Sequence, residues 1–479
     1  MTLPGISCDS GDSQGSLTEV NELKVLAVCG FLGYGFPEES LAGGMARQPH
    51  VVGADNGSTD PGPYYLGSGD QLTKRQQMVR DLGLSLAASR KANVPFIVGS
   101  AGTAGGDPHV DSVLDVLHDV SKRDGHSYRL AVIRAEIDKT TVKAAVRSGK
   151  VRPLGKVREL TEGDVDSATR IVGQMGVGPF VTALEGGADV IIAGRACDTA
   201  IFASMAAMKG FDLGLAYHMA KIIECGAQCA IPTGTNDCIL ATLRDDHFEL
   251  EPISPHRRLT PTSVAAHMMY EQPAPDLFHE PEGLVDLQGV EIEQVDKRRV
   301  RVSGSRFEPA ATPTIKLEGA CLAGYRTIAV AGIADPNLID RLDRVESDVR
   351  GTVDSTLRNA GVGDYDLRFI AYGRDGVLMA PNARADRPPH EVGLVLEAIA
   401  RDQETADAIL SLARSTFLHS GFEGRKATGG NLAFPFSPSD FRGGPVFEFN
   451  VYHLMEVDDP SAPFSVEFED IRNRHLVPT

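Results

Sequence analysis

The chain has 479 residues, a formal net charge of −18 at pH 7 and a hydrophobic share of 42%. That share excludes disorder of the whole chain, and the negative charge argues against nucleic acid or an anionic membrane surface as the main partner. No apolar run approaches the 18 or more residues needed to cross a bilayer. Glycine, with 50 residues, exceeds its usual share of about 7%. The length predicts two or three domains.

The first 20 residues are rich in Ser, Gly and Asp and resemble neither a secretory signal nor an Arg-rich transit peptide. We therefore expect a flexible tail over 1–20 and a cytoplasmic protein. The seven cysteines lie in scattered apolar surroundings, which favours reduced thiols over a disulfide framework. Cys225 and Cys229 are spaced to share one helix face, so a structural zinc site is one alternative there.

From residue 24 on, short apolar runs alternate with amphipathic stretches, the pattern of a parallel sheet covered on both faces. A β-rich stretch is expected late in this part, over Val285–Leu317. The predicted strands are Val25–Val28, His50–Ala54, Pro95–Val98, Leu130–Ile133 and Ala188–Ala193, and the predicted helices are Lys74–Ala92, Val110–Lys122, Thr140–Ser148 and Asp166–Met175.

The end of the chain has a different pattern. Its predicted elements follow the order βαββαβ, in which two helices cover one face of an antiparallel sheet, as in ferredoxin-like folds. The fold class is therefore α/β, a mostly parallel doubly wound sheet domain (21–320) followed by a smaller α+β ferredoxin-like domain (321–479). The predicted elements here are Tyr325–Ile333, Pro336–Asn359, Tyr365–Tyr372, Glu391–Ile399, Glu404–Leu418 and Val446–Leu454.

Glycine-rich turns follow the first three predicted strands, where open α/β sheets bind their ligands. The first turn (30–35) lacks the GxGxxG spacing of dinucleotide-binding folds. In the second, Asn56 and Ser58 are candidates to hold a substrate oxygen, and Asp55 or Asp60 a base or metal ligand. In the third, small residues let a ligand approach the backbone. Its candidate binding residues are Ser100, Gly102 and Thr103. Tight turns alone are the competing interpretation of all three segments.

Further candidates follow the fourth and fifth strands. Glu136 and Lys139 are an acid–base pair, or else the solvated start of a helix capped by Asp138. Arg195 is suited to binding a carboxylate, and Asp198 to orienting Arg195 or capping the next helix. In the helix after that, His218, Lys221 and Cys225 are spaced to share one face, with Glu224 beside the thiol. His267 is a weaker candidate, spaced to pair with Glu271.

The segments GRACDTAIFA (194–203), HMAKIIECGAQC (218–229) and SVAAHMMYE (263–271), with the turn at 99–106, resemble the AtuA-like acyclic terpene utilisation family. The resemblance covers about residues 24–320, and the final segment resembles the ferredoxin-like domain that accompanies it. It implies catabolism of branched, terpene-derived acids as CoA thioesters. The first turn, CGFLGYGFPEE, departs from the family's pattern.

Two classes of function are compatible with these residues. The first is a lyase or isomerase that moves a proton beside a carbonyl, with Asn56, Ser58, Asp60, Ser100, Gly102, Thr103 and Arg195 binding a carboxylate or acyl-CoA, and His218, Glu136, Lys139, Asp198 and Glu224 as catalytic candidates. The second is a non-catalytic accessory or binding subunit, for example of an acyl-CoA carboxylase. No particular cofactor is predicted, a divalent metal remains an alternative, and a homo-oligomer is expected.

Overall fold

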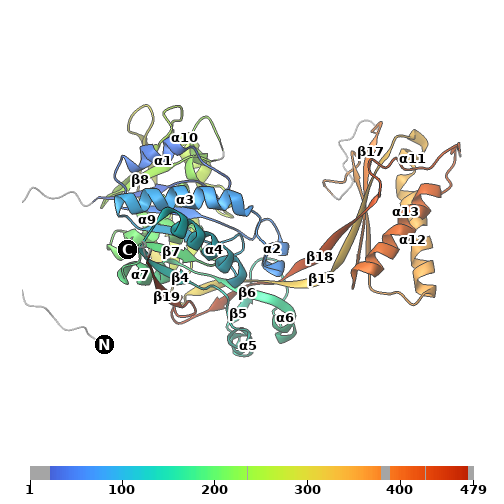
Figure 1. Ribbon diagram of the computed structural model, residues 1–479, viewed down its shortest axis with the longest axis horizontal. Helices are drawn as coiled ribbons and strands as arrows, with labels where there is room; N and C mark the ends of the chain where they lie inside the picture. The colour runs from blue at the N-terminus through green and yellow to red at the C-terminus, as the bar shows by residue number, and fades with distance from the viewer. Residues whose placement is uncertain (1–21, 235, 379–388, 427, 473–479) are drawn as a thin grey trace, which may run out of the picture.

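The computed structural model describes residues 22–234, 236–378, 389–426 and 428–472. It has a large first lobe and a smaller second lobe, connected by two long strands, β15 (Thr314–Ile333) and β18 (Asp440–Glu456) (Figure 1). No helix in the described residues has the length and apolar character that a membrane crossing requires.

A ten-stranded sheet forms the centre of the first lobe, in the order β12-β13-β9-β8-β1-β2-β3-β7-β4-β19. Five adjacent strands are parallel, and they are the five predicted from continuous apolar runs: β1 (Leu23–Ala27), β2 (Val51–Asp55), β3 (Phe96–Gly99), β7 (Val190–Ala193) and β4 (Tyr128–Ile133). The other five pair antiparallel: β8 (Ile239–Leu243), β9 (His247–Pro252), β13 (Val300–Ser303), β12 (Glu291–Gln294) and β19 (Val466–Ile471). The sheet is therefore mixed rather than mostly parallel, because hairpins extend one edge and a late strand closes the other.

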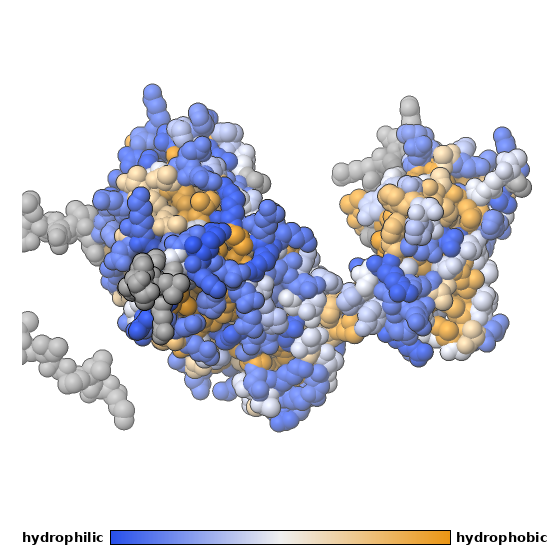
Figure 2. Space-filling model, viewed as in Figure 1, coloured by the Kyte–Doolittle hydropathy of each residue, from blue (hydrophilic) through white to orange (hydrophobic). Residues whose placement is uncertain are grey.

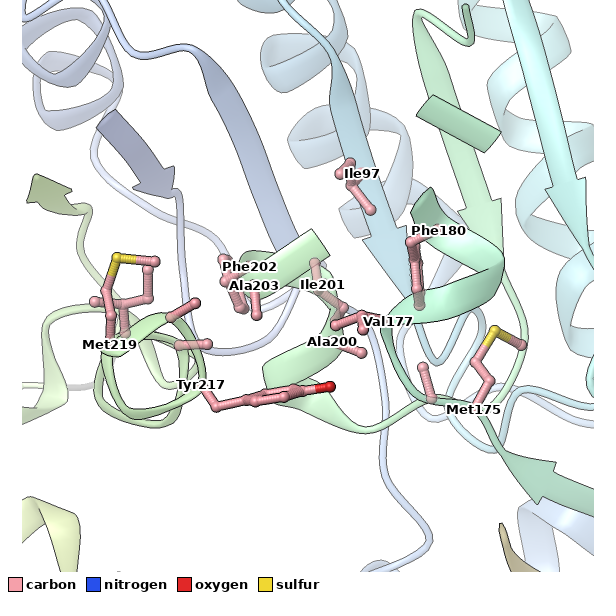
Figure 3. Packing of buried hydrophobic residues seen from close by; sticks show 14 of the residues in the cluster. Ile97, Met175, Val177, Phe180, Ala200, Ile201, Phe202, Ala203, Tyr217 and Met219 are labelled. Carbon is pink, nitrogen blue, oxygen red and sulfur yellow. The ribbon is translucent and has the colours of Figure 1, made fainter. Parts of the chain in front are cut away.

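Helices cover both faces of the parallel strands, as the alternating pattern predicts. On one face, Met78 and Leu82 pack with Val98 and other buried residues of β2, β3 and β7. On the other, the all-round hydrophobic helix α8 lies against the sheet, and Figure 3 shows its Ile201 and Phe202 in the same buried cluster as Ile97 of β3. The first face carries α1 (Glu38–Met45), α3 (Arg75–Ala92) and α4 (Asp107–Asp124), and the second α7 (Val177–Glu185), α8 (Asp198–Met208) and α9 (Leu213–Ile223).

The helix predicted over 166–175 is wrong. A short helix, α6 (Glu162–Ser167), ends there, and β6 (Ala168–Gln174) pairs antiparallel with β15. The β-branched residues Thr169, Ile171 and Val172 favour a strand. The strand with which they pair lies more than 140 positions later in the chain. The β-rich stretch is confirmed: a three-stranded sheet contains β10 (Leu277–Glu280), β11 (Gly283–Asp286) and β14 (Arg306–Pro309). Shorter elements are α2 (Pro63–Ser68), α5 (Lys139–Arg147), β5 (Val151–Pro153), η1 (Gly226–Cys229) and α10 (Pro261–Met268).

The second lobe contains strands and helices in the predicted order. Its sheet runs β16-β17-β15-β18, all antiparallel, and β5 of the first lobe extends it. The helix expected over 336–359 is divided at Arg341. The boundary expected at 320/321 falls inside β15, which pairs with β6 before it enters the second lobe. The remaining elements are α11 (Pro336–Asp340), α12 (Leu342–Asn359), β16 (Asp366–Tyr372), β17 (Val392–Ala400) and α13 (Gln403–His419), the helices packing on one face.

Candidate acid–base site

The turns after β1, β2, β3 and β7 meet at the carboxyl edge of the parallel strands. Asn56, fully buried, connects three segments: its Nδ2 donates to the carbonyl of Leu32 at 2.8 Å, and its Oδ1 accepts from the amide of Gly102 at 2.6 Å. The backbone of Asn56 adds bonds to Gly99 and Thr103. Both polar atoms of the Asn56 side chain thus bond the neighbouring turns. This agrees with the interpretation of the segment as a tight turn rather than with a side chain that holds a substrate oxygen.

Glycines in these turns admit a neighbouring backbone. A Cβ at Gly57 would lie 1.9 Å from the carbonyl oxygen of Thr103, and one at Gly105 would lie 2.2 Å from the amide nitrogen of Arg195. Ser100 and Thr103 adopt left-handed φ angles of 47° and 96° between these contacts. Backbone strain of this kind, about 1–3 kcal/mol per residue, persists only where the surroundings determine it. The space beside Gly57 and Gly105 is therefore filled by a neighbouring turn, although at Gly105, in the third turn, the small residues predict room for a ligand.

We expect Gly57→Ala to lower the free energy of unfolding by about 1–3 kcal/mol or more, because overpacking forces the 99–106 turn to move. Gly351→Ala is the matched control. A Cβ at Gly351, in α12, meets nothing within 4 Å, so alanine there should stabilise the helix by about 0.5–1 kcal/mol. Urea denaturation of both variants checks this. Equal stability of Gly57→Ala and wild type would show that the turns do not pack as described.

Arg195, which follows β7, is held in a buried ionic network. Its Nε donates to Oε2 of Glu318 at 2.8 Å, and its Nη1 donates to Oγ of Ser100 at 3.2 Å. Glu318 is fully buried and also accepts from Nζ of Lys316 at 2.7 Å and from Oγ1 of Thr59 at 2.9 Å. Burial opposes ionisation of Glu318, but Arg195 and Lys316 outweigh it and lower the pKa to about 2. The network fixes the guanidinium and leaves Arg195 to support its neighbours electrostatically.

Next to Arg195 lies a group of carboxyls that burial makes hard to ionise. Oδ1 of Asp198, at the start of α8, is 3.8 Å from Nη1 of Arg195. Burial raises the pKa of Asp198, although Arg195 and Lys221 oppose it. Burial also raises the pKa of Glu224, to about 8, against the attraction of Lys221, whose ammonium pairs with Glu224 Oε1 at 2.5 Å. Burial and the nearby charge of Asp198 also raise the pKa of Asp55, at the end of β2.

This group has an accessible side at Asp198. The Asp198 side chain retains 32% of its exposure, whereas that of Arg195 retains 5%. Oδ1 of Asp198 and Oδ1 of Asp55 accept no hydrogen bond from the described residues. Exposed Asp60 and Glu271 both raise the pKa of Asp198, which places the second turn and the end of α10 around it. Asp198 thus combines a partly exposed side chain with a buried Oδ1 that has no hydrogen-bond partner among the described residues, next to two cations.

Three of the predicted catalytic residues lie elsewhere. His218 is fully buried, with Nδ1 2.7 Å from Oγ of Ser305 and its ring edge-on to Phe248, and burial lowers its pKa to about 3. Glu136 accepts from the amide of Asp107 at 2.9 Å, and burial raises its pKa. Lys139 donates to the carbonyl of Ala168 at 2.6 Å rather than to Glu136. Asp138 caps α5 through the amide of Thr140, which confirms that alternative.

The remaining predicted positions have local roles. Oγ of Ser58 accepts from the amide of Asp60 at 3.0 Å, and Oγ1 of Thr103 from the amide of Leu72 at 2.9 Å. Gly102 has a φ of +68° and packs against His109. His267 stacks on Tyr270, and burial lowers its pKa to about 4. The shared helix face expected for His218 and Cys225 is wrong, because α9 ends at Ile223.

Neither a disulfide nor a metal cluster is found within the described ranges. The six cysteines there are all free. No group of three or more His, Cys, Asp or Glu among those residues has the arrangement to hold a metal ion. Burial raises the pKa of the Cys225 thiol, and Glu224 adds to this. Cys225 is therefore a poor nucleophile, as its place after a helix C-terminus predicts.

Sequence reasoning missed Glu318 and Lys316, which complete the network around Arg195. Both lie on β15, and Glu318 is 123 positions from Arg195. The available signal was two charges at alternate positions in an otherwise apolar strand, TIKLEG, which places both on one face of a buried sheet. Charged residues are almost never fully buried unless they are paired, so that pattern indicates an ionic partner from another element.

The fold and the site together define an α/β protein with a buried carboxyl and cation cluster at the carboxyl edge of its parallel strands. The model of a family described as acyclic terpene utilisation family protein AtuA matches residues 75–242 and 253–435. Because these ranges make up well over half of the chain, the protein belongs to that family. No curated protein and no solved structure was found to match it.

Proposed function

We propose that this protein is an enzyme of acyclic terpenoid or branched-acid metabolism, a lyase or isomerase that moves a proton on the carbon next to an acyl carbonyl. The substrate would be a carboxylic acid or its CoA thioester. The observation that carries the proposal is the partly exposed Asp198 carboxylate beside Arg195 and Lys221. Membership of the family supplies the metabolic setting, acyclic terpene utilisation.

In this proposal Asp198 removes the proton, and the negative charge of the enolate that forms is stabilised electrostatically by the cations of the site, to whose network Lys316 also belongs. Glu224, with a pKa of about 8, holds a proton at pH 7 and can donate it. An isomerase returns the proton to another carbon of the conjugated system. In a dehydratase the enolate expels a β-hydroxyl group, which takes the proton of Glu224 and leaves as water. Either reaction uses the same base.

Deuterium exchange tests this without knowledge of the product. The protein is incubated in D₂O with an acyclic, methyl-branched enoyl-CoA and with its β-hydroxy derivative, and the acyl group is analysed by mass spectrometry. We expect enzyme-dependent gain of deuterium next to the carbonyl. The absence of exchange with both compounds, under conditions where the protein is folded, would contradict the proposal.

A non-catalytic accessory role is the second candidate, favoured by exposed aromatic side chains on the second lobe. Tyr372, Phe436 and Phe441 are 49%, 58% and 37% exposed. Figure 2 shows several hydrophobic areas on the surface of this lobe. The same region is where we would expect a homo-oligomer or a carboxylase-type partner to dock. A stable complex in co-purification together with no exchange by the isolated protein would favour this role.

A further inference from the structure

A cavity of about 590 Å³ lies beside the acid–base site, between the β10-β11-β14 sheet and the strands β15 and β18. Its volume is within the range of about 300–1,000 Å³ that small-molecule pockets occupy. Its lining includes none of Arg195, Asp198 and Glu224, so the proposed proton transfer does not by itself explain it.

Two polar groups of the lining are buried or half-buried, Glu280 and Lys316. Glu280 is 8% exposed and accepts from Oγ1 of Thr199 at 2.7 Å. Its Oε2, with the Cys197 thiol beside it, has no partner of hydrogen-bond geometry in the part of the chain that the structure describes. Burial raises the pKa of Glu280 to about 8, so it is a neutral hydrogen-bond donor at pH 7. Lys316 adds an ammonium, which pairs with Glu318 and lies 4.6 Å above the Tyr452 ring.

Part of the remaining lining is aliphatic. Leu154, Leu284 and Leu454 come from three separate segments and all line the cavity, together with prolines and an alanine. Exposed Arg152 is also in the lining and has no ion-pair partner among the described residues. A neutral donor and a cation beside aliphatic walls suit a ligand with one polar head and an apolar chain. The carboxylate of Glu308, which also lines the cavity, disfavours a polyanion inside.

We propose that this cavity binds the acyl group of an aliphatic carboxylic acid, with the acyl oxygen at Lys316 and Glu280 and the chain along Leu154, Leu284 and Leu454. The role of this cavity in the reaction rests on the proposed function. The cavity is linked to the candidate base because Thr199, which donates a hydrogen bond to Glu280, directly follows Asp198 in the chain. The acyl oxygen would therefore lie on the side of the cavity that faces the candidate base.

Calorimetric binding of hexanoate and decanoate at pH 7 tests the cavity. Each buried methylene should tighten binding by about fourfold, so we expect decanoate to bind at least tenfold more tightly than hexanoate. Leu454→Trp fills the cavity and should abolish decanoate binding. Leu322→Trp, at a side chain that is 47% exposed outside the cavity, is the control and should leave binding unchanged. Equal affinity for the two acids, or wild-type affinity in Leu454→Trp, would overturn the proposal.

A second comparison identifies the source of the acyl group. Tighter binding of decanoyl-CoA than of decanoate points to the thioester, and the reverse points to the free acid. CoA alone binding as tightly as decanoyl-CoA would contradict an acyl pocket. Deuterium exchange without chain-length-dependent binding of the acids would overturn only the proposed acyl site in the cavity. Chain-length-dependent binding without deuterium exchange would overturn only the proposed function.

Discussion

Arg195→Met is expected to lower the free energy of unfolding by about 3–5 kcal/mol, because it leaves Glu318 buried with one fewer cation. Glu318 has no exposed surface, and its ionisation depends on Arg195 and Lys316. Without Arg195, the pKa of Glu318 should rise, and part of the loss should be recovered by taking up a proton at lower pH. Urea denaturation at pH 7 and pH 5 measures both effects.

Two further variants separate the buried pair from a general loss of charge. Arg75→Met breaks an ion pair with Asp119 in which both side chains are more than half exposed, and should cost less than about 1 kcal/mol. The double variant Arg195→Met/Glu318→Met removes both buried charges and should be more stable than Arg195→Met alone. A double variant no more stable than the single one would show that Glu318 is not the residue that Arg195 compensates.

Asp198→Asn is expected to reduce deuterium exchange by about 10²–10⁴-fold, the range for loss of a general base. Asparagine keeps the size and polarity of the side chain but cannot accept the proton. The free energy of unfolding should change by no more than about 1 kcal/mol. The lost interaction with the α8 N-terminus, about 0.3–1 kcal/mol, is offset by relief of repulsion from Asp55 and Glu271. Exchange and urea denaturation are measured on the same preparation.

The control for Asp198→Asn is Asp138→Asn, another helix-start aspartate. Asp138 is an N-cap whose side chain accepts from Thr140, and asparagine caps as well as aspartate. This variant should exchange deuterium at the wild-type rate. An Asp198→Asn protein that keeps more than a tenth of the wild-type rate would contradict its assignment as the base.

The sequence predicted the parallel strands well because each is a short, continuously apolar run followed by a turn. It also placed Arg195 and Asp198 together, since both directly follow the most apolar strand. Contacts between elements that lie far apart in the chain could not be predicted from the sequence. Glu318 lies on β15, and β19 comes from the end of the chain to pair with β4. The sequence predicts a helix in place of strand β6, because the partner strand β15 comes more than 140 positions later.

His218 shows the opposite error. Its spacing from Lys221 fits a functional helix face, but α9 is buried on nearly every side and the spacing does not distinguish the face that packs on Phe248. A helix that is hydrophobic all round indicates burial. Lys221, at 7% exposure, lies in the same helix yet contacts Glu224. Only the three-dimensional arrangement separates the histidine in the core from the lysine at the site.

The pH profile of deuterium exchange, recorded from pH 5 to 10, tests the acid–base site most directly. The rate should rise with pH as Asp198 loses its proton, and fall above about pH 8 as Glu224 ionises and repels the enolate. Glu224→Gln should keep the rise and lose the fall, because glutamine stays neutral at every pH. A Glu224→Gln profile that falls at the same pH as wild type, or a wild-type rate independent of pH, would contradict the site.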